Sequence, residues 1–339
     1  MHYRSNVLKT LQAALIAISL CMMETSICRA AILDGVGVMG DSASIRSSSY
    51  KWPVQLQTNR GINFGGSGLP YDYAVGGATS ASLLSGNQHT KMRNDVLAGK
   101  VTLGIIFIGN NDWGSTTGLQ IAAGSIPSAT QTAFENSIFS NIKTAVDTQL
   151  NAGIEGMIIG GIEDISLTPT GQTVTDVDAR SRIQSSISNV NSQLLAYAQA
   201  NHLPFIDFFG LANDIYDSGL VVGGVNINFS TSGSNPRNFW IDDLHPGILG
   251  NAILGNVFMT AMNVAYGTNL PLYTDKQILT LAGLSSSYTG ETFSTSYNLA
   301  NYVHYSAVPE LSSLALTFFG MAGLLVIARK KATLPRSAA

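Results

Sequence analysis

The chain has 339 residues, of which 12% are charged, and it contains 34 glycines and carries a formal net charge of −3. That length can hold one large domain or two small ones, and it can bury a sizeable core. The low charge content and abundant glycine exclude a disordered chain and a coiled coil, and they are typical of an exported protein rich in loops.

Residues 1–30 have the pattern of a secretory signal peptide. Arg4 and Lys9 supply positive charge, and an apolar stretch follows at 11–23. The segment ends at Ala30, a small residue of the kind found at cleavage sites. We therefore expect export and cleavage after Ala30. A short membrane anchor is the alternative interpretation.

The body of the chain is acidic and lacks cysteine. Both cysteines, Cys21 and Cys28, lie within 1–30, so the exported domain would contain no disulfide and no cysteine metal site. Residues 1–30 and 309–339 together hold seven basic and two acidic residues, which leaves 11 basic and 19 acidic residues, a net charge of −8, for the rest. This balance argues against nucleic acid or an anionic membrane as a partner of the body.

Between the two ends, apolar segments alternate with amphipathic ones. In chain order the predicted elements are a strand ending at Gly40, a strand at 101–109, a helix at 130–152, a strand at 154–162, a helix at 176–201, a strand at 203–209 and a helix at 247–266. Strands separated by helices of this length pair in parallel through right-handed crossovers. We therefore expect an α/β protein, a three-layer α/β/α sandwich with a mostly parallel central sheet.

Polar residues follow two of these strands directly. Asp41 and Ser42 come after the first strand, and residues 109–112 end the second. Ligands of such sheets bind beyond the carboxyl ends of the strands, so this placement indicates a site. The glycine- and serine-rich segments 114–128 and 226–238 are predicted to be long surface loops around its mouth.

A serine becomes a nucleophile when a base takes its proton and a third group orients the base. The histidines of the body are His89, His202, His245 and His304. His245 differs from the others because Asp242 lies three residues before it and Pro246 directly after it, so a tight turn would let Asp242 hold the imidazole. Taken alone, such a pair is also typical of loop residues that cap a helix.

Acyl transfer further needs hydrogen-bond donors for the tetrahedral oxyanion. A glycine turn at Gly77, in "YAVGGATS", and the amides of "IGNND" at a strand end are candidates, although each alone is equally typical of a turn. No clustered histidine or cysteine spacing and no lysine-containing phosphate loop occurs. We expect neither a metal nor an organic cofactor.

Taken together, these motifs resemble the four blocks of the GDSL, or SGNH, hydrolase family, in order and over most of 36–266. The matching residues are Gly40-Asp41-Ser42, Gly77, Gly109-x-Asn111-Asp112 and Asp242-x-x-His245. No Gly-x-Ser-x-Gly elbow occurs, so an ordinary α/β-hydrolase is disfavoured. Ala43 departs from the family, where many members have leucine, and this puts the packing behind the nucleophile in question.

The resemblance implies a role for each matching residue. Ser42 would be the nucleophile, His245 the base that later protonates the leaving alcohol, and Asp242 the residue that orients His245. The N–H groups of Ser42 and Gly77 and the side chain of Asn111, rather than that of its neighbour Asn110, would form the oxyanion hole. The remaining motif residues and their neighbours are expected to shape turns; these are Gly40, Asp41, Asp112 and Asp243.

The C-terminal residues 306–339 form a separate segment. Residues 311–328 are 18 uncharged, mostly apolar positions followed by Arg329, Lys330 and Lys331, which predicts a membrane span with a cytoplasmic tail. Preceded by "AVPE", the segment resembles the PEP-CTERM sorting tag of exopolysaccharide-producing Gram-negative bacteria, with Pro-Glu-Leu in place of Pro-Glu-Pro. The resemblance implies an exosortase-type sorting enzyme as partner and transient tethering at the periplasmic or outer surface. A permanent anchor is the alternative.

The sequence thus predicts a signal peptide at 1–30, a hydrolase domain at 31–305 and a tail at 306–339. The expected activity is that of a serine esterase or lipase that cleaves carboxylic esters through an acyl-enzyme, its substrate a small ester or an acylated glycan. Two alternatives stay open: a carbohydrate O-deacetylase acting on exopolysaccharide, and a catalytically silent surface module that binds carbohydrate or matrix.

Overall fold

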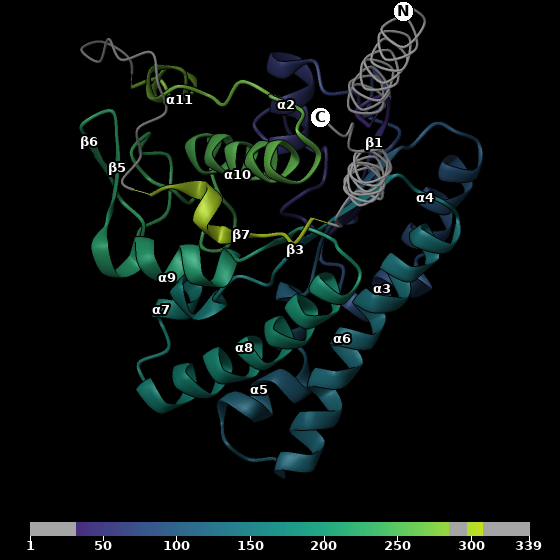
Figure 1. Ribbon diagram of the computed structural model, residues 1–339. Helices are drawn as coiled ribbons and strands as arrows, with labels where there is room; N and C mark the ends of the chain where they lie inside the picture. The colour runs from purple at the N-terminus through teal and green to yellow at the C-terminus, as the bar shows by residue number, and fades with distance from the viewer. Residues whose placement is uncertain (1–31, 285–296, 308–339) are drawn as a thin grey trace, which may run out of the picture. The chain divides into compact units, whose positions relative to one another are not determined.

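Figure 1 shows the fold in a computed structural model, which describes residues 32–284 and 297–307. The described fold belongs to one compact unit that ends at Tyr305. The expected signal peptide at 1–30 and the expected membrane span at 311–328 lie outside the described residues.

A five-stranded sheet forms the centre of the molecule, in the order β1-β2-β3-β4-β7. The strands are β1 (Val36–Gly40), β2 (Leu103–Phe107), β3 (Gly156–Gly160), β4 (Phe205–Ile206) and β7 (Val303–His304). The first four run parallel, and β7 pairs antiparallel with β4. Beyond β1, Asp72 bridges in parallel to Val38. A separate antiparallel hairpin joins β5 (Leu220–Val222) to β6 (Val225–Ile227).

Helices cover both faces of this sheet (Figure 1). They are α2 (Trp52–Arg60), α3 (Ser80–Ser85), α4 (Gln88–Leu97), α5 (Thr116–Ala122), α6 (Ser128–Asn151), α7 (Pro169–Gln172), α8 (Val177–Ala200), α9 (Phe208–Ser218), α10 (Ile248–Tyr266) and α11 (Asp275–Leu281). Short 3₁₀ helices lie at η1 (Asn110–Gly114), η2 (Ile165–Leu167) and η3 (Leu299–Tyr302). The fold is therefore the predicted α/β sandwich with a mostly parallel sheet.

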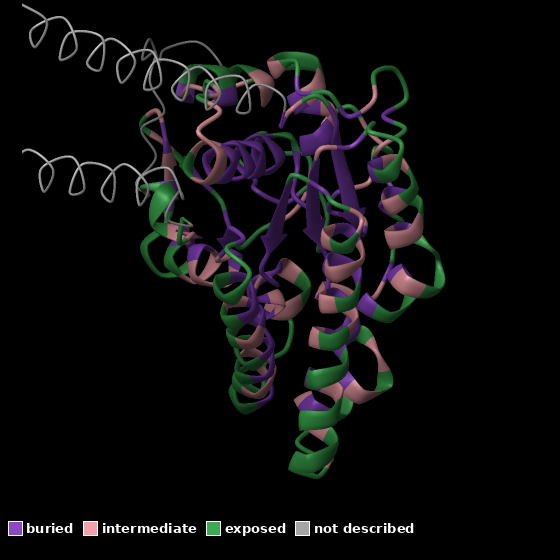
Figure 2. Ribbon diagram, turned by 45° about the vertical axis from the view of Figure 1, so that its right-hand side comes forward, coloured by how far each residue is buried: buried purple, intermediate pink, exposed green. Residues whose placement is uncertain are grey.

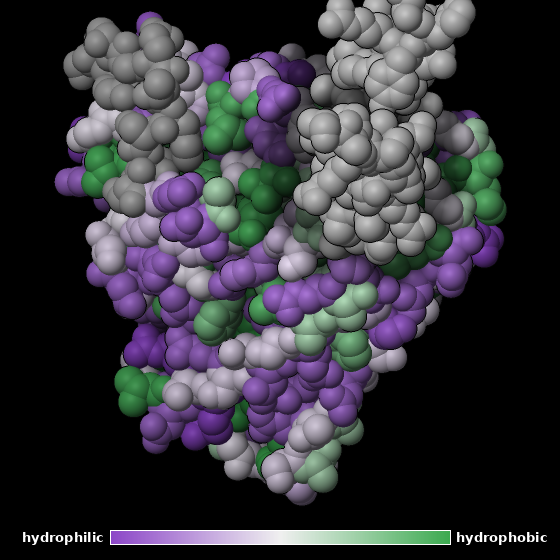
Figure 3. Space-filling model, viewed as in Figure 1, coloured by the Kyte–Doolittle hydropathy of each residue, from purple (hydrophilic) through white to green (hydrophobic). Residues whose placement is uncertain are grey.

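Successive strand side chains alternate between two hydrophobic clusters, as the pleat of a sheet requires. Val36 and Val38 of β1 pack in one cluster with α2, α9, α10 and α11. Met39 points to the other face, in a cluster with α3, α4, α6 and α8. Every residue of β1, β2 and β3 is buried, and Figure 2 shows the strands buried between helices with exposed outer sides. On the face shown in Figure 3, hydrophilic residues predominate.

Helix α10 fills the centre of the first cluster. It is the one helix among the described residues that is long and apolar enough to cross a membrane, but 78% of its apolar 18-residue window is buried inside the protein, as in a core helix. Trp52, the first residue of α2, stacks on Phe258 of α10 with ring centroids 4.1 Å apart. The side chain of Asn251 on α10 accepts a hydrogen bond from the N–H of Trp52 at 3.0 Å. The start of α2 is therefore fixed to α10.

Two predicted segments differ from the structure. The strand predicted at 203–209 is limited to β4, because Asp207 accepts a hydrogen bond from the N–H of Gly210 (2.8 Å) and so begins α9. The loop predicted at 114–128 is wrong in part, because it contains α5, which begins where the Ser115 side chain accepts from the N–H of Gly118 (3.2 Å). The helices predicted at 130–152, 176–201 and 247–266 are confirmed to within two residues at each end as α6, α8 and α10.

Candidate active site

Ser42 lies two residues beyond the end of β1, at the carboxyl edge of the sheet. Gly40 ends the strand at a place that has no room for a side chain, since a Cβ there would come within 2.6 Å of the carbonyl oxygen of Phe107. The buried side chain of Gln88 also holds Gly40, accepting from its N–H and donating to its C=O, both at 2.9 Å. The strand end is therefore fixed, and the following turn presents Ser42.

That turn is organised around Asp41. The C=O of Asp41 accepts hydrogen bonds from the N–H groups of Ser44 and Ile45, both at 3.1 Å, and its carboxylate accepts from the N–H of Ala43 at 2.9 Å. Asp41 is 3% exposed, and its burial raises the pKa of its carboxyl to about 6. Ala43 is itself buried in the core behind the turn.

The loop before α10 holds the other two triad candidates. Trp240 and Pro246 form an antiparallel bridge that closes the loop, and the N–H of Ile241 donates to the C=O of His245 at 2.9 Å. Inside it, Asp242 accepts hydrogen bonds from the N–H groups of Leu244 (2.9 Å) and His245 (2.7 Å). The loop is therefore tight enough for Asp242 to reach the imidazole three residues later.

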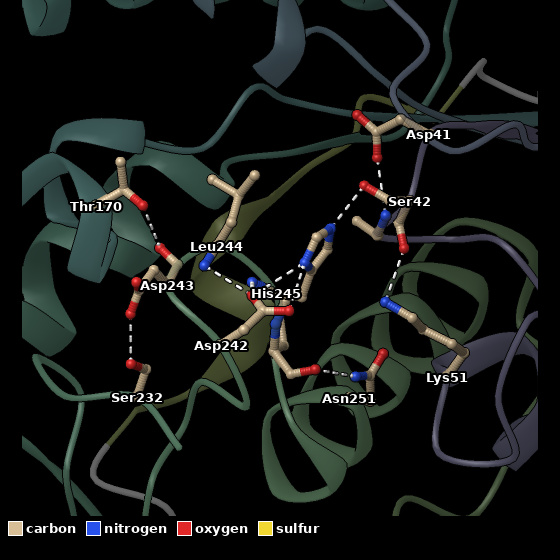
Figure 4. A network of polar contacts seen from close by, with 12 residues as sticks. Asp41, Ser42, Lys51, Thr170, Ser232, Asp242, Asp243, Leu244, His245 and Asn251 are labelled. Carbon is tan, nitrogen blue, oxygen red and sulfur yellow. Dashed lines mark hydrogen bonds and ion pairs between the residues drawn. The ribbon is translucent and has the colours of Figure 1, made fainter.

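The structure brings Ser42, His245 and Asp242 into line (Figure 4). The Nε2 atom of His245 lies 2.8 Å from Oγ of Ser42, and its Nδ1 atom lies 3.0 Å from each carboxylate oxygen of Asp242. Partial burial acts to raise the pKa of Asp242, but the two loop N–H groups and the imidazole outweigh it and hold that pKa below its usual value. An ionised Asp242 favours the proton on Nδ1, which leaves Nε2 free to accept the hydroxyl proton.

Of the predicted oxyanion-hole residues, Asn111 borders the same turn, and Gly77 lies two residues after Val75, whose N–H donates to the C=O of Gly40 at 3.1 Å. Gly77 has a φ of +74°, a conformation that favours glycine, and its α-carbon faces open space. Among the described residues, no protein acceptor is hydrogen-bonded to the N–H of Ser42 or of Gly77. The Asn111 amide donates to the C=O of Ala78 at 3.0 Å and more weakly to Asp41 at 3.3 Å. The Asn111 amide therefore lies at the turn that carries Ser42, and the oxyanion-hole role of all three donors stays a prediction.

The remaining motif residues have structural contacts. The carboxylate of Asp112 accepts from both the N–H and the hydroxyl of Ser80 at 2.8 Å. Asp243 accepts from the Ser232 hydroxyl at 2.6 Å, outside the line of the triad. The segment predicted at 226–238 does not line the pocket that contains Ser42, which corrects its expected place at the site mouth.

Two ionisable residues at the site were not identified as site residues from the sequence. Glu163, three residues after β3, lines the pocket and accepts from the Asn110 amide at 2.6 Å, and its burial raises its pKa to about 7. Its position at a strand end was a usable signal. Lys51 is 4% exposed and donates from Nζ to the C=O of Ser42 at 2.7 Å. A lysine in the polar stretch "SSSYK" gives no such signal.

A pocket of about 350 Å³ opens beside Ser42 and His245. Most of its wall is apolar and comes from η1, α5, the segment between η2 and α8, and α8 itself; the main contributors are Trp113, Leu119, Ala122, Ile165, Val174 and Ile183. Leu119, Val174 and Leu244 are among only ten large hydrophobic side chains exposed in the described residues. Exposed apolar side chains gathered beside the Ser42 hydroxyl indicate a surface for an apolar ligand.

No group of three or more histidine, cysteine, aspartate or glutamate side chains that could hold a metal ion occurs in residues 32–284 and 297–307. A hydroxyl, an imidazole and a carboxylate in line at the carboxyl edge of a parallel sheet form the arrangement of a serine hydrolase.

Comparison with known proteins identifies the family. Residues 36–258 match the family model of the GDSL-like lipase/acylhydrolases. The chain belongs to this family, and it is a hydrolase that acts on ester bonds. A search of curated proteins finds no match.

Two solved structures illustrate the similarity. Axe2, an acetylxylan esterase from Geobacillus stearothermophilus, is 14% identical with a TM-score of 0.44, and the alignment covers 69% of this chain and 95% of that one. An extracellular lipase from Streptomyces rimosus is 16% identical with a TM-score of 0.38, over 52% of this chain and 80% of that one. At this similarity neither structure bears on the substrate of this chain.

The raised pKa values of three carboxyl groups predict how the stability of the fold depends on pH. Burial raises the pKa values of Asp41 and Asp72 to about 6 and of Glu163 to about 7, so between about pH 4 and 7 the folded chain binds more protons than the unfolded chain. The stability that these bound protons contribute to the folded state is present at low pH and is lost as the pH rises through these pKa values. His89, whose pKa burial lowers, opposes it with one group. We expect urea unfolding to give a larger free energy of unfolding at about pH 5 than at about pH 8.

The Glu163→Gln variant should flatten this dependence, because it removes the group with the highest of the three pKa values; one such group contributes at most about 1.4 kcal/mol per pH unit. Glu155→Gln, at an exposed position, is the matched control and should leave the slope unchanged. Equal slopes in both variants would contradict the assignment.

Proposed function

We propose that the protein is a serine carboxylesterase that works through an acyl-enzyme on Ser42. The observation that carries the proposal is the line from the Ser42 hydroxyl through His245 to Asp242, with contacts of 2.8 and 3.0 Å. These distances are within the range needed for proton transfer. They support a nucleophile that is paired with its base.

The reaction follows from this geometry. His245 Nε2 takes the proton of Ser42 as Oγ attacks the ester carbonyl, and the oxyanion that forms is met by the N–H groups of Ser42 and Gly77 and by the amide of Asn111. The imidazolium, stabilised by Asp242, then gives its proton to the leaving alcohol, and the acyl group stays on Oγ. Water attacks the acyl-enzyme with the same base, which releases the acid and restores the Ser42 hydroxyl.

Asn111 must exchange a hydrogen bond to take part. Its amide hydrogens have two acceptors in the free protein, of which Asp41, at 3.3 Å, is the weaker. An oxyanion is a stronger acceptor than a distant carboxylate oxygen, so it can draw this hydrogen as charge develops. The interaction then strengthens in the transition state, which is the condition for it to accelerate the reaction.

The apolar pocket favours an ester that bears an aliphatic chain. A water molecule occupies about 30 Å³ in the liquid, and a methylene group is of similar size. The pocket of about 350 Å³ therefore holds about ten such groups. An acetyl group would leave most of this apolar wall in contact with water. We infer a substrate with a chain of medium length, on the acyl or the alcohol side.

Replacement of Ser42 by alanine tests the mechanism. We expect Ser42→Ala to lower turnover of a p-nitrophenyl ester by at least about a thousandfold, because within the described part of the chain Ser42 supplies the one hydroxyl that contacts the His245 imidazole. The change removes one oxygen at a half-buried position, so the urea midpoint should stay close to that of the parent. A fluorophosphonate probe should label the parent and not the variant. Near-normal turnover in the variant, or a parent without esterase activity, would overturn the proposal.

Chain-length selectivity tests the use of the pocket. Each buried methylene is worth ~0.8 kcal/mol, about fourfold in kcat/KM, so kcat/KM should rise from acetate through butanoate to octanoate. Ala122→Phe fills the pocket and should reduce octanoate hydrolysis more than tenfold while sparing acetate. Ala123→Phe, exposed and outside the pocket, is the matched control.

A parallel series of alkyl acetates distinguishes the two sides of the ester. Length dependence only in that series would place the chain on the alcohol side. A parent that prefers acetylated glycans and shows no length dependence would contradict the aliphatic substrate and favour an O-deacetylase.

We also propose, from the sequence patterns at the two ends, that residues 1–30 direct export and that residues 306–339 tether the protein and are processed by an exosortase-type enzyme. Export would place the site at the periplasmic or outer surface, where esters of the envelope or matrix are available. The intact mass of the exported protein tests both ends, since a mass that includes either segment contradicts its removal.

A further inference from the structure

The Lys51 side chain contacts the backbone of Ser42 through its carbonyl oxygen, not through the hydroxyl. Lys51 immediately precedes α2, whose first residue, Trp52, is fixed to α10 by its stacking on Phe258 and its hydrogen bond to Asn251. From this fixed point the side chain extends to the turn after β1, where Nζ donates to the C=O of Ser42 at 2.7 Å (Figure 4). The rigidity of the α2–α10 contact therefore sets the position of the ammonium group.

The charge of Lys51 is buried without a direct ion pair to any described carboxylate. Burial lowers its pKa, and the nearby charges of Asp242 and Asp41 act against that effect. A desolvated ammonium group with no direct counterion is unfavourable for folding, and an apolar residue of the same size would avoid that cost. Lys51 lies near the carboxylates of Asp41 and Asp242, which contact the nucleophile turn and the base. We therefore take its unfavourable burial as a sign that Lys51 has a function at this site.

Lys51 and Asp41 hold the two ends of one peptide group. The C=O of Ser42 accepts from Lys51, and the N–H of Ala43, on the other side of the same peptide bond, donates to Asp41 at 2.9 Å. The second carboxylate oxygen of Asp41 accepts from the Asn111 amide at 3.3 Å. Lys51 and Asp41 together thus fix the backbone of the nucleophile, and Asp41 also contacts Asn111, a predicted oxyanion-hole donor.

We propose that Lys51 is a positioning residue, which fixes the backbone of Ser42 and keeps Asp41 ionised so that the oxyanion hole is formed before substrate binds. This inference rests on the proposed esterase function. Asp41 needs both oxygens as acceptors, one for the N–H of Ala43 and one for Asn111. A proton on Asp41 would turn one of these acceptors into a donor and release Asn111 from its position.

The groups that face Asp41 make it dependent on Lys51. Besides its burial, the charge of Asp112, beyond the end of β2, raises the pKa of Asp41, and the charge of Asp41 in turn raises that of Glu163, beyond the end of β3. Lys51 is the cation that lowers the pKa of Asp41 against them. Without that cation, Asp41 would take up its proton at higher pH.

The experiment compares Lys51→Met with Lys51→Gln, which keeps a donor but not the charge. Both are measured from about pH 5 to about pH 9 on a p-nitrophenyl ester that the parent hydrolyses. We expect Lys51→Met to lower kcat by about 10- to 100-fold with KM within about twofold, because preorganised donors act on the transition state. In both variants the acid limb of kcat/KM should move to higher pH. Lys91→Met, at an exposed position on α4, is the control and should match the parent.

Two results would overturn the inference. One is a folded Lys51→Met or Lys51→Gln variant with kcat and an acid limb like those of the parent. The other is a lower kcat that follows only the folded fraction, with an unshifted acid limb, which would make Lys51 purely structural. If Lys51→Met does not fold, the acid limb of Lys51→Gln decides alone. Failure of the proposed function itself is recognised separately, because the parent would then neither hydrolyse the ester nor react with a fluorophosphonate.

Discussion

The contact between Ser42 Oγ and His245 Nε2 joins residues 203 positions apart, and its 2.8 Å length depends on how α10 packs against the sheet. His245 lies three residues before α10, so any shift of that helix moves the imidazole. Asn251, fully buried on α10, donates to the C=O groups of Pro246 and Gly247 just after His245 and accepts from the N–H of Trp52. One amide therefore ties the base loop and α2 to the same helix.

The carboxyl edge of the sheet also brings three carboxyl groups close together in a buried environment that disfavours their ionisation. Asp41, Asp112 and Glu163 lie at the ends of three adjacent parallel strands, and burial raises the pKa of each. Parallel strands end at one edge, so a sheet that brings catalytic groups together also brings their carboxylates together. Lys51 offsets part of this repulsion at Asp41. Ionisation of these buried carboxyls at neutral pH therefore lowers the free energy of unfolding. Such a cost is common at functional sites, and here it falls on residues around the turn that carries Ser42.

Much of this arrangement could be predicted from the sequence, and the exceptions have physical causes. Ser42, Asp242 and His245 were identifiable because their local patterns, each ambiguous alone, occur together in the order of the family's motif blocks. Lys51 was not, because its role depends on a contact between α2 and the end of β1 that no local pattern encodes. The strand predicted at 203–209 was too long, because the cap at Asp207 outweighed the β propensity of its neighbours.

The apolar pocket was also absent from the prediction, because its wall is assembled from η1, α5, α7 and α8, each of which contributes only a few side chains. The segment at 114–128 was predicted to be a long surface loop, whereas it contains α5, which lines the pocket. This wall links substrate binding to catalysis. An aliphatic chain against this wall would displace water beside Glu163 and Asp41, and lower the local dielectric in which the oxyanion donors act. A longer chain would then raise kcat as well as lower KM, since part of its binding energy would appear only in the transition state.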